Sequence, residues 1–343
     1  MGNVGTPRFY VNIYEYLESI GTISIPDNHR YLRTNPTKTF IQKGHEYNDG
    51  HNDTTVLPDC PIAWKDLAGD KGFVALLGHN MASCNAQVML QEGVPDYTAM
   101  YPSEIVNSAE IGGHPSPEYD GFTIWKGDFS SFDQKGEADI FINAAGVELE
   151  VTNRTMQFRW ESGQNWGVPD PTPYNGKDLK CNSIVIGSYY DMPHSPDLNL
   201  KLSYSYGGIN NTQTKSGSTF SNAMYTKPAD WGERGAWQLG DYQNYRTGKR
   251  IWNLSFTHIL DSDIMPLLGV QNYTQTLTED ILNGTDFFSQ VWNKTLGNAL
   301  PFIFQPDVDS DEFAICKFKS NSLDYNQVAL NVYDFNLIIE EVW

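Results

Sequence analysis

The chain has 343 residues, and its 42 acidic and 23 basic residues give a formal charge of −19 at pH 7. A surface of this sign repels phosphate backbones and anionic lipids, so we expect no direct contact with nucleic acid or membrane. Only 19% of the residues are charged, whereas glycine, asparagine and aromatic residues are plentiful. This composition favours a mainly β protein with short strands and tight turns, and the length favours two domains.

Residues 1–60 are expected to form an N-terminal helix followed by an extended arm. Apolar side chains at helical spacing predict an amphipathic helix from Tyr10 to Ile20, ending at Gly21. Such a short helix is marginal alone, so it is expected to dock either on its own chain or on a neighbouring subunit. The polar segment 24–59 is expected to wrap a surface.

Residues 61–187 are expected to form a β-sandwich. The glycine-bounded apolar run 72–80 is typical of a core strand. Further short strands are predicted at 88–90, 121–125, 139–142, 147–151, 156–160 and 183–187. Turn residues separate them in a rhythm typical of a sandwich or jelly roll. The proline-containing segment 187–196 is expected to bridge to a second domain, 188–343.

Residues 188–343 are expected to form an antiparallel barrel with one inserted helix. Hairpins are predicted within 207–237, and strands at 198–202, 251–256, 300–306, 313–318 and 333–343. Thr285 or Asp286 as N-cap and Gly297 as C-cap delimit the helix. We expect this module to be the assembly unit, with a core of Trp252, Phe256, Phe288, Trp292, Phe302, Phe304 and Phe335.

The C-terminal pattern resembles a known module. The segments 248–256, 297–307, 313–318 and 332–343, with the helix between the first two, resemble the closing barrel of distal-tail-like proteins of tailed bacteriophages. Over nearly its full length the chain is similar to uncharacterised structural proteins of marine phages, through the stretches 5–10, 77–80, 189–198 and 300–343. The segment 61–187 is similar to galactose-binding-like jelly rolls, which in tail proteins more often serve assembly than sugar binding.

This resemblance implies a non-enzymatic virion structural protein, made in the host bacterial cytoplasm. It would assemble with itself as a closed ring or collar, a hexamer or a trimer, in the tail or tail tip, where it would take a distal-tail or adaptor-like role. Other tail or head proteins of the virion would be its partners. One alternative is a glycan- or receptor-binding module of the virion, and another is a capsid decoration protein.

Two residues are candidates for contact with a ligand such as a glycan. His79 stands at the end of the apolar run, between Gly78 and Asn80, and Trp125 ends a predicted strand. A lone histidine without a nearby motif is more often structural, so capping of a turn is the favoured interpretation of His79. Core packing is the favoured interpretation of Trp125.

Acidic residues at alternating positions, Asp307, Asp309 and Asp311, begin like a calcium-binding loop. The sixth position is Glu312 rather than glycine, and the twelfth is Phe318 rather than glutamate. We therefore interpret the segment as an acidic hairpin tip and expect no metal. His45 and His51, with Asp49, fit no recognised metal-binding spacing and are interpreted as a solvated loop.

Signatures of catalysis are absent from the sequence. It contains no H-E-x-x-H, G-x-S-x-G, P-loop or dinucleotide-binding motif. The carboxylate pairs Asp128 with Asp133 and Glu148 with Glu150 would suit glycoside hydrolysis only if they faced each other across a cleft. Four cysteines, at 60, 84, 181 and 316, form no C-x-x-C pair and are expected to be buried thiols. We expect neither an enzyme nor a cofactor.

Overall fold

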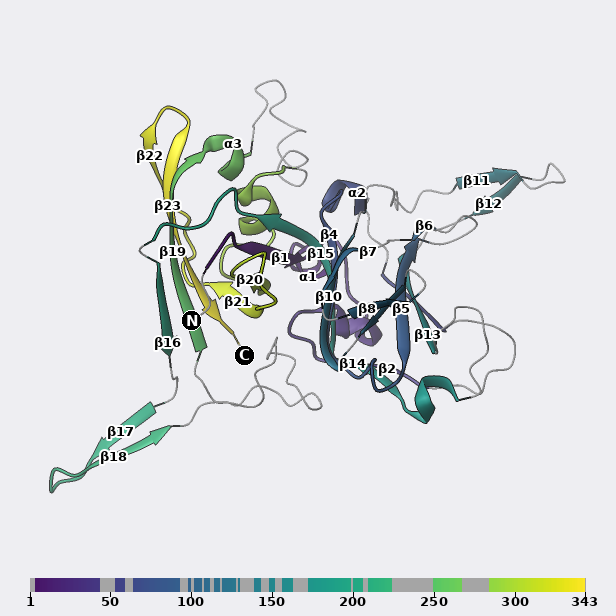
Figure 1. Ribbon diagram of the computed structural model, residues 1–343, viewed down its shortest axis with the longest axis horizontal. Helices are drawn as coiled ribbons and strands as arrows, with labels where there is room; N and C mark the ends of the chain where they lie inside the picture. Colours follow the sequence, from purple (N-terminus) through teal and green to yellow (C-terminus); the bar gives the residue numbers. More distant parts are fainter. Residues whose placement is uncertain are drawn as a thin grey trace.

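The computed structural model describes residues 4–43, 53–58, 64–92, 98–99, 102–106, 108–111, 114–117, 119–127, 129, 139–142, 148–151, 156–162, 172–198, 200–205, 209–223, 249–266 and 284–342. Within them the fold is mainly β, as predicted, and is organised by one large antiparallel sheet (Figure 1). Its strands, in spatial order, are β16 (Lys201–Ser205), β19 (Lys249–Leu260), β23 (Val332–Glu341), β21 (Ala314–Phe318), β20 (Phe302–Gln305), β1 (Arg8–Asn12), β15 (Ser183–Asp191), β4 (Gly72–His79), β10 (Gly121–Gly127) and β7 (Pro102–Val106). A further strand, β22 (Tyr325–Ala329), pairs with β23.

Smaller sheets and short helices complete the described part of the chain. The second largest sheet has the order β3 (Asp53–Val56), β13 (Met156–Ser162), β5 (Ala86–Glu92) and β6 (Thr98–Ala99). Two-stranded sheets are β14 (Leu179–Cys181) with β2 (Phe40–Gln42), β8 (Ser108–Ile111) with β9 (His114–Pro117), β11 (Asp139–Ile142) with β12 (Glu148–Val151), and β17 (Ile209–Gln213) with β18 (Thr219–Ala223). The helical segments are α1 (Ile13–Ser19), η1 (Asp27–Leu32), α2 (Trp64–Leu67), η2 (Pro173–Gly176), α3 (Asp261–Ile264) and η3 (Phe288–Trp292).

The N-terminal helix begins later than its apolar spacing predicts. Residues Arg8–Asn12 form β1, which pairs with β15 on one side and β20 on the other, so the expected helical start at Tyr10 is wrong. The side chain of Asn12 then accepts the backbone N–H of Glu15 and caps α1. Pairing on both sides satisfies more backbone groups of β1 than one extra helical turn would. The helix α1 docks on its own chain.

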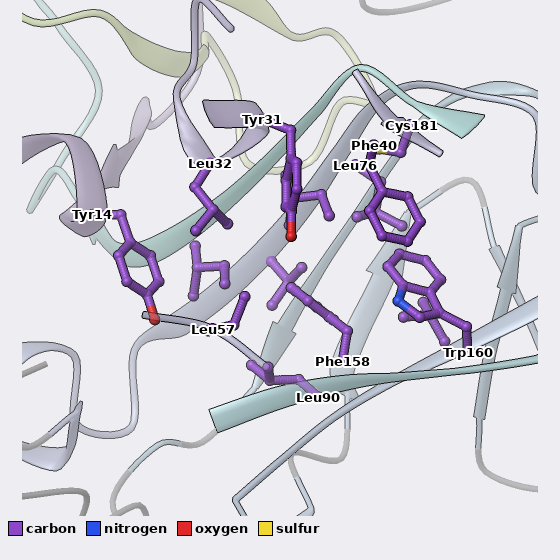
Figure 2. Packing of buried hydrophobic residues seen from close by; sticks show 14 of the residues in the cluster. Tyr14, Tyr31, Leu32, Phe40, Leu57, Leu76, Leu90, Phe158, Trp160 and Cys181 are labelled. Carbon is purple, nitrogen blue, oxygen red and sulfur yellow. The ribbon is translucent and has the colours of Figure 1, made fainter. Parts of the chain in front are cut away.

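A first core fills the space between the large sheet and the β3–β13–β5–β6 sheet. One face of β4, β10 and β15 contributes to it, together with β5, β13, α1 and α2. Figure 2 shows Phe40 lying over Trp160, with their ring centroids 4.8 Å apart. Burial of this apolar surface is the dominant stabilising contribution to this half of the molecule.

A second core lies at the other end of the same sheet face. It is formed by β1, β19, β20, β21 and β23, with Phe287 and Val291 from the helical turn. Phe9 of β1 lies at its centre, and its ring centroid is 5.5 Å from that of Phe287 and 5.3 Å from that of Phe304. The N-terminal strand is therefore part of the C-terminal core.

The opposite face of the sheet carries a third core. Alternate residues of β4 serve different faces: Val74 and Leu76 belong to the first core, whereas Phe73, Ala75 and Leu77 belong to the third. This two-sided burial explains the continuous apolar run of the predicted core strand, which β4 confirms. The third core joins β4 and β10 to β20 and β21.

Several strand boundaries differ from the predicted ones. β15 continues to Asp191, where Arg8 of β1 forms an ion pair with it, so the segment expected to begin a bridge at 187 is in the sheet. The predicted division at 187/188 thus lies inside one strand, and the division into 1–60, 61–187 and 188–343 remains a prediction. β16 begins at Lys201 rather than at Leu198, which is fully exposed.

Candidate assembly surfaces

The large sheet ends in a free edge that leads into a projecting hairpin. β16 pairs with β19 in the register Lys201 to Asn253 and Ser205 to Lys249, and no described strand pairs with its other side. Beyond it, β17 and β18 form a separate two-stranded ribbon, which projects from the body at the lower left of Figure 1. We call residues 209–223 the arm. It is the described part of the hairpins predicted within 207–237.

The arm is held together by its own ladder and turn. The backbone N–H of Thr214 donates to the carbonyl of Ser218 at 2.8 Å, and Gly217, at φ +86°, donates to the carbonyl of Thr214 at 2.9 Å. Glycine suits this left-handed backbone because it has no Cβ to clash. Ser221 Oγ donates to Asn211 Oδ1 at 2.7 Å across the ladder. All of these hydrogen bonds join residues within the hairpin.

Exposure and charge set the arm apart from the rest of the chain. Its described side chains are exposed except for half-buried Thr214, and Phe220 has 64% of its surface exposed. Between Asp197 and Asp230 the sequence contains three lysines and no acidic residue, although the whole chain carries 42 acidic residues. An isolated two-stranded hairpin is marginally stable in water, so a partner surface would stabilise this one.

Three exposed aliphatic residues lie near one another along the backbone at the far end of β19. Leu260 pairs with Val332 in the sheet, and the turn between β22 and β23 places Leu330 beside them. Leu260, Val328 and Leu330 are exposed by 52%, 48% and 85%. We call these three residues the tip. Large apolar side chains grouped at the surface are a common mark of interaction sites.

The residues predicted for the barrel core belong to the second core or pack against it, with one correction. Trp252, Phe256, Phe302, Phe304 and Phe335 are buried members of the second core, and Trp292 packs against it half-buried.

Phe288 is the correction, because its side chain is only half-buried and its neighbour Phe287 occupies the core instead. Asp286 caps this turn by accepting the N–H of Ser289 at 2.9 Å, as one of the two predicted caps. Counting from that cap, Phe287 and Val291 share the inward face.

His79 and Trp125, the candidate ligand contacts, are both buried. Nδ1 of His79 accepts the backbone N–H of Met81 at 3.3 Å, so Nε2 carries the proton and donates to Thr123 Oγ1 at 3.0 Å. In this tautomer His79 caps a turn and has no free basic nitrogen. Burial lowers its pKa to about 4, against which the nearby Asp120 acts weakly. Trp125 is 1% exposed and belongs to the first core.

The acidic segment predicted as a hairpin tip connects β20 and β21. Asp307 Oδ1 accepts the N–H of Asp309 at 3.2 Å, and Val308 donates its N–H to the carbonyl of Thr6 at 2.9 Å. The segment therefore packs on the chain's own N-terminal residues. In the described ranges, no three His, Cys, Asp or Glu side chains, Asp307, Asp309 and Asp311 included, gather as they would around a metal ion.

Other candidates fall partly outside the described residues. His45, Asp49, His51, Asp128 and Asp133 lie outside them, as does the cysteine at position 60. Glu148 and Glu150 are on β12. Cysteines 84, 181 and 316 are buried free thiols, as predicted for each.

The arm and the tip were not predicted as sites. A signal for the arm is present in the sequence, in the long interval without an acidic residue, but the tip depends on which strands meet at one turn.

No protein-family model, curated protein or solved structure matches this chain. Among the described helices, none has the length and apolar character needed to span a bilayer.

Proposed function

We propose that this chain is a non-enzymatic structural protein of a tailed-phage virion that assembles with itself into a closed ring or collar in the tail or at its tip. The observation that supports this most is the arm: an exposed, acid-free hairpin attached to a free sheet edge of a strongly acidic protein. A hairpin with two open edges and exposed side chains is marginally stable alone, and it gains stability when another surface covers it. Assembly supplies that surface.

The proposal includes a finer description of the fold. The strands around the second core, β16 through β1 with the inserted helical turn, correspond to the barrel of distal-tail-like proteins. The two facing sheets around the first core correspond to a jelly-roll-like sandwich. The N-terminal strand β1 packs Phe9 into the second core while α1 packs into the first, so the two regions are joined through one sheet. This joint would transmit load between neighbours in a ring.

The glycan-binding alternative receives less support. Sugar-binding tryptophans present an open ring face, but Trp125 is 1% exposed and His79 is 2% exposed. A capsid decoration protein would use the same arm and edge, so the position in the particle separates it from a tail protein.

Purified particles of the virus that encodes this chain provide the test. Peptide mass spectrometry is expected to find the chain in intact particles, and gold-labelled antibodies against it are expected to mark the tail. Labelling over the whole head would favour the decoration protein. Absence from particles, together with a monomeric recombinant protein at high micromolar concentration, would overturn the proposal.

A further inference from the structure

We infer that the arm of one copy binds the tip of the next copy, in a head-to-tail contact. The inference rests on the proposed self-assembly and adds the pair of surfaces that makes it. The arm leaves the sheet beside Lys249, whereas the tip surrounds Leu260, at the other end of β19. Figure 1 shows the two at opposite ends of this part of the sheet. The twelve residues of β19 separate them by roughly 40 Å, at about 3.3 Å per residue.

The apolar groups of the two surfaces complement each other. On the arm, Phe220 is an exposed large apolar side chain, and it pairs with Thr212 of β17. On the tip, Leu260, Val328 and Leu330 offer an aliphatic surface to a ring. Burying an aromatic side chain against aliphatic neighbours is a common source of interface affinity. Neither surface is covered by another described segment of the same chain.

Charge favours the same pairing. The arm carries Lys215 in its turn and no acidic residue. Around the tip, the backbone N–H of Asp261 donates to the carbonyl of Asn331 at 3.1 Å, and the Asp334 carboxylate accepts the N–H of His258 at 2.9 Å. Both acidic residues therefore lie at the same end of β19 as Leu260. The segments 254–266 and 320–334 contain no lysine or arginine. In the proposed contact, the positively charged arm of one copy meets the acidic surroundings of the tip of the next copy. This attraction would steer the two copies together and favour one relative orientation.

The geometry of the contact determines the kind of assembly. Because arm and tip are different surfaces at different ends of one strand, every copy has one of each to offer. Such heterologous contacts form a closed ring when the rotation between copies closes, and an open filament when it does not. A two-fold contact of arm with arm would instead stop at a dimer.

Cysteine cross-linking of the full chain tests this contact. Two variants, Phe220→Cys and Leu330→Cys, are prepared separately and then mixed under mild oxidation. The expected result is a cross-linked dimer in the mixture and none in either variant alone, and the double variant is expected to give a ladder of higher multimers. A disulfide in Phe220→Cys alone would overturn the head-to-tail contact in favour of an arm-to-arm one. No disulfide in the mixture, with the protein oligomeric, would also overturn it.

Sedimentation of surface variants gives a second measurement. Phe220→Ser and Leu330→Ser are each expected to raise the dissociation constant of the oligomer at least tenfold. Ile41→Ser, on β2, removes a side chain of similar exposure, 53%, away from both surfaces and is the matched control. Oligomers that persist unchanged in both variants would contradict the arm–tip contact while leaving self-assembly intact. A wild-type chain that is monomeric at every concentration would contradict both the arm–tip contact and the proposed self-assembly.

Discussion

Arg250 and Glu341 join the first residues of β19 to the last residues of the C-terminal strand through a two-pronged contact. Nε of Arg250 donates to Oε2 of Glu341 and Nη2 donates to Oε1, each at 3.1 Å. The side chains are 15% and 10% exposed, and the guanidinium lies over the ring of Trp252 at 5.0 Å. Parallel N–H···O bonds of this kind fix both distance and angle, so they hold the register of β19 against β23.

Replacing Glu341 by glutamine is expected to destabilise the fold by about 3 kcal/mol, because it leaves a largely buried guanidinium without one of its counter-charges. Urea unfolding measures this change. Glu340→Gln is the matched control: Glu340 contacts Lys319 only at 3.9 Å on a more exposed surface. That variant is expected to stay within about 0.5 kcal/mol of the wild type. Equal effects of the two substitutions would show that the buried pair does not stabilise the strand.

The neighbours Phe287 and Phe288 give a second comparison. Phe287 is fully buried and contacts the rings of Phe9 and Phe335, whereas Phe288 is half-buried outside the cluster. Phe287→Ala is expected to cost about 3 to 5 kcal/mol of unfolding free energy. Phe288→Ala is expected to cost about 1 kcal/mol, in proportion to the smaller area that it buries. Thermal or urea unfolding of the two variants measures both losses. A larger loss of unfolding free energy for Phe288→Ala would show that Phe288, rather than Phe287, is the buried ring.

The sequence predicted those strands whose buried faces are visible as an apolar pattern in their own residues. In β23, Phe335, Leu337 and Ile339 face the core and alternate with exposed residues, which is the pattern read from the sequence. The doubly buried β4 was likewise visible as a continuous apolar run. These elements need no knowledge of their partners to be recognised.

Elements that depend on distant partners were missed or misplaced. Tyr10 fits a helical spacing as well as a strand, and only pairing with β15 and β20 selects the strand. Four of the five residues of β22 are exposed and only Tyr325 is half-buried, so its pairing with β23 leaves no buried apolar alternation in the sequence. Phe288 was chosen over Phe287 because neighbouring residues lie roughly 100° apart around a helix, so an error of one residue in the inward face exchanges the buried ring for its neighbour. The tip was missed for the same reason, because it is formed by two segments about seventy residues apart in the sequence.

His79 is expected to make stability depend on pH in the acidic range. Its pKa in the folded protein is about 4, because it is buried, against an ordinary value of 6.5. Between these values the unfolded chain binds a proton that the folded chain does not, so stability falls as pH drops from 6.5 to 4. The loss due to this group is about 3 kcal/mol at most.

The measurement is urea unfolding of wild type and His79→Gln at several pH values. Carboxylates titrate in both proteins, so the difference between the two curves isolates the histidine. This difference is expected to narrow as the pH falls through the window. Parallel curves would mean that His79 is solvated and charged in the folded state.

Lys294 is expected to produce a pH dependence in the alkaline range. Its side chain is fully buried, and Nζ donates to the carbonyl of Leu67 at 2.9 Å, to Ser188 Oγ at 3.2 Å and to Gln290 Oε1 at 2.7 Å. Burial lowers its pKa from 10.5 to about 7, and the nearby Asp286 opposes this shift. Three elements, α2, β15 and the helical turn, therefore meet at one ammonium group whose proton is held weakly.

The sign of the effect follows from linkage. Between pH 7 and 10.5 the unfolded chain retains the lysine proton while the folded chain loses it, so stability rises with pH in this window, by up to about 1.4 kcal/mol per unit. Lys294→Met is expected to abolish this rise and to destabilise the fold overall by about 1 to 3 kcal/mol, because its three acceptors lose their donor. Lys317→Met, which removes a more exposed lysine bonded to the carbonyl of Ala299 at 2.7 Å, controls for the loss of charge and is expected to keep the wild-type slope. A Lys294→Met protein with the same slope as the wild type would show that the buried amine does not titrate in this range.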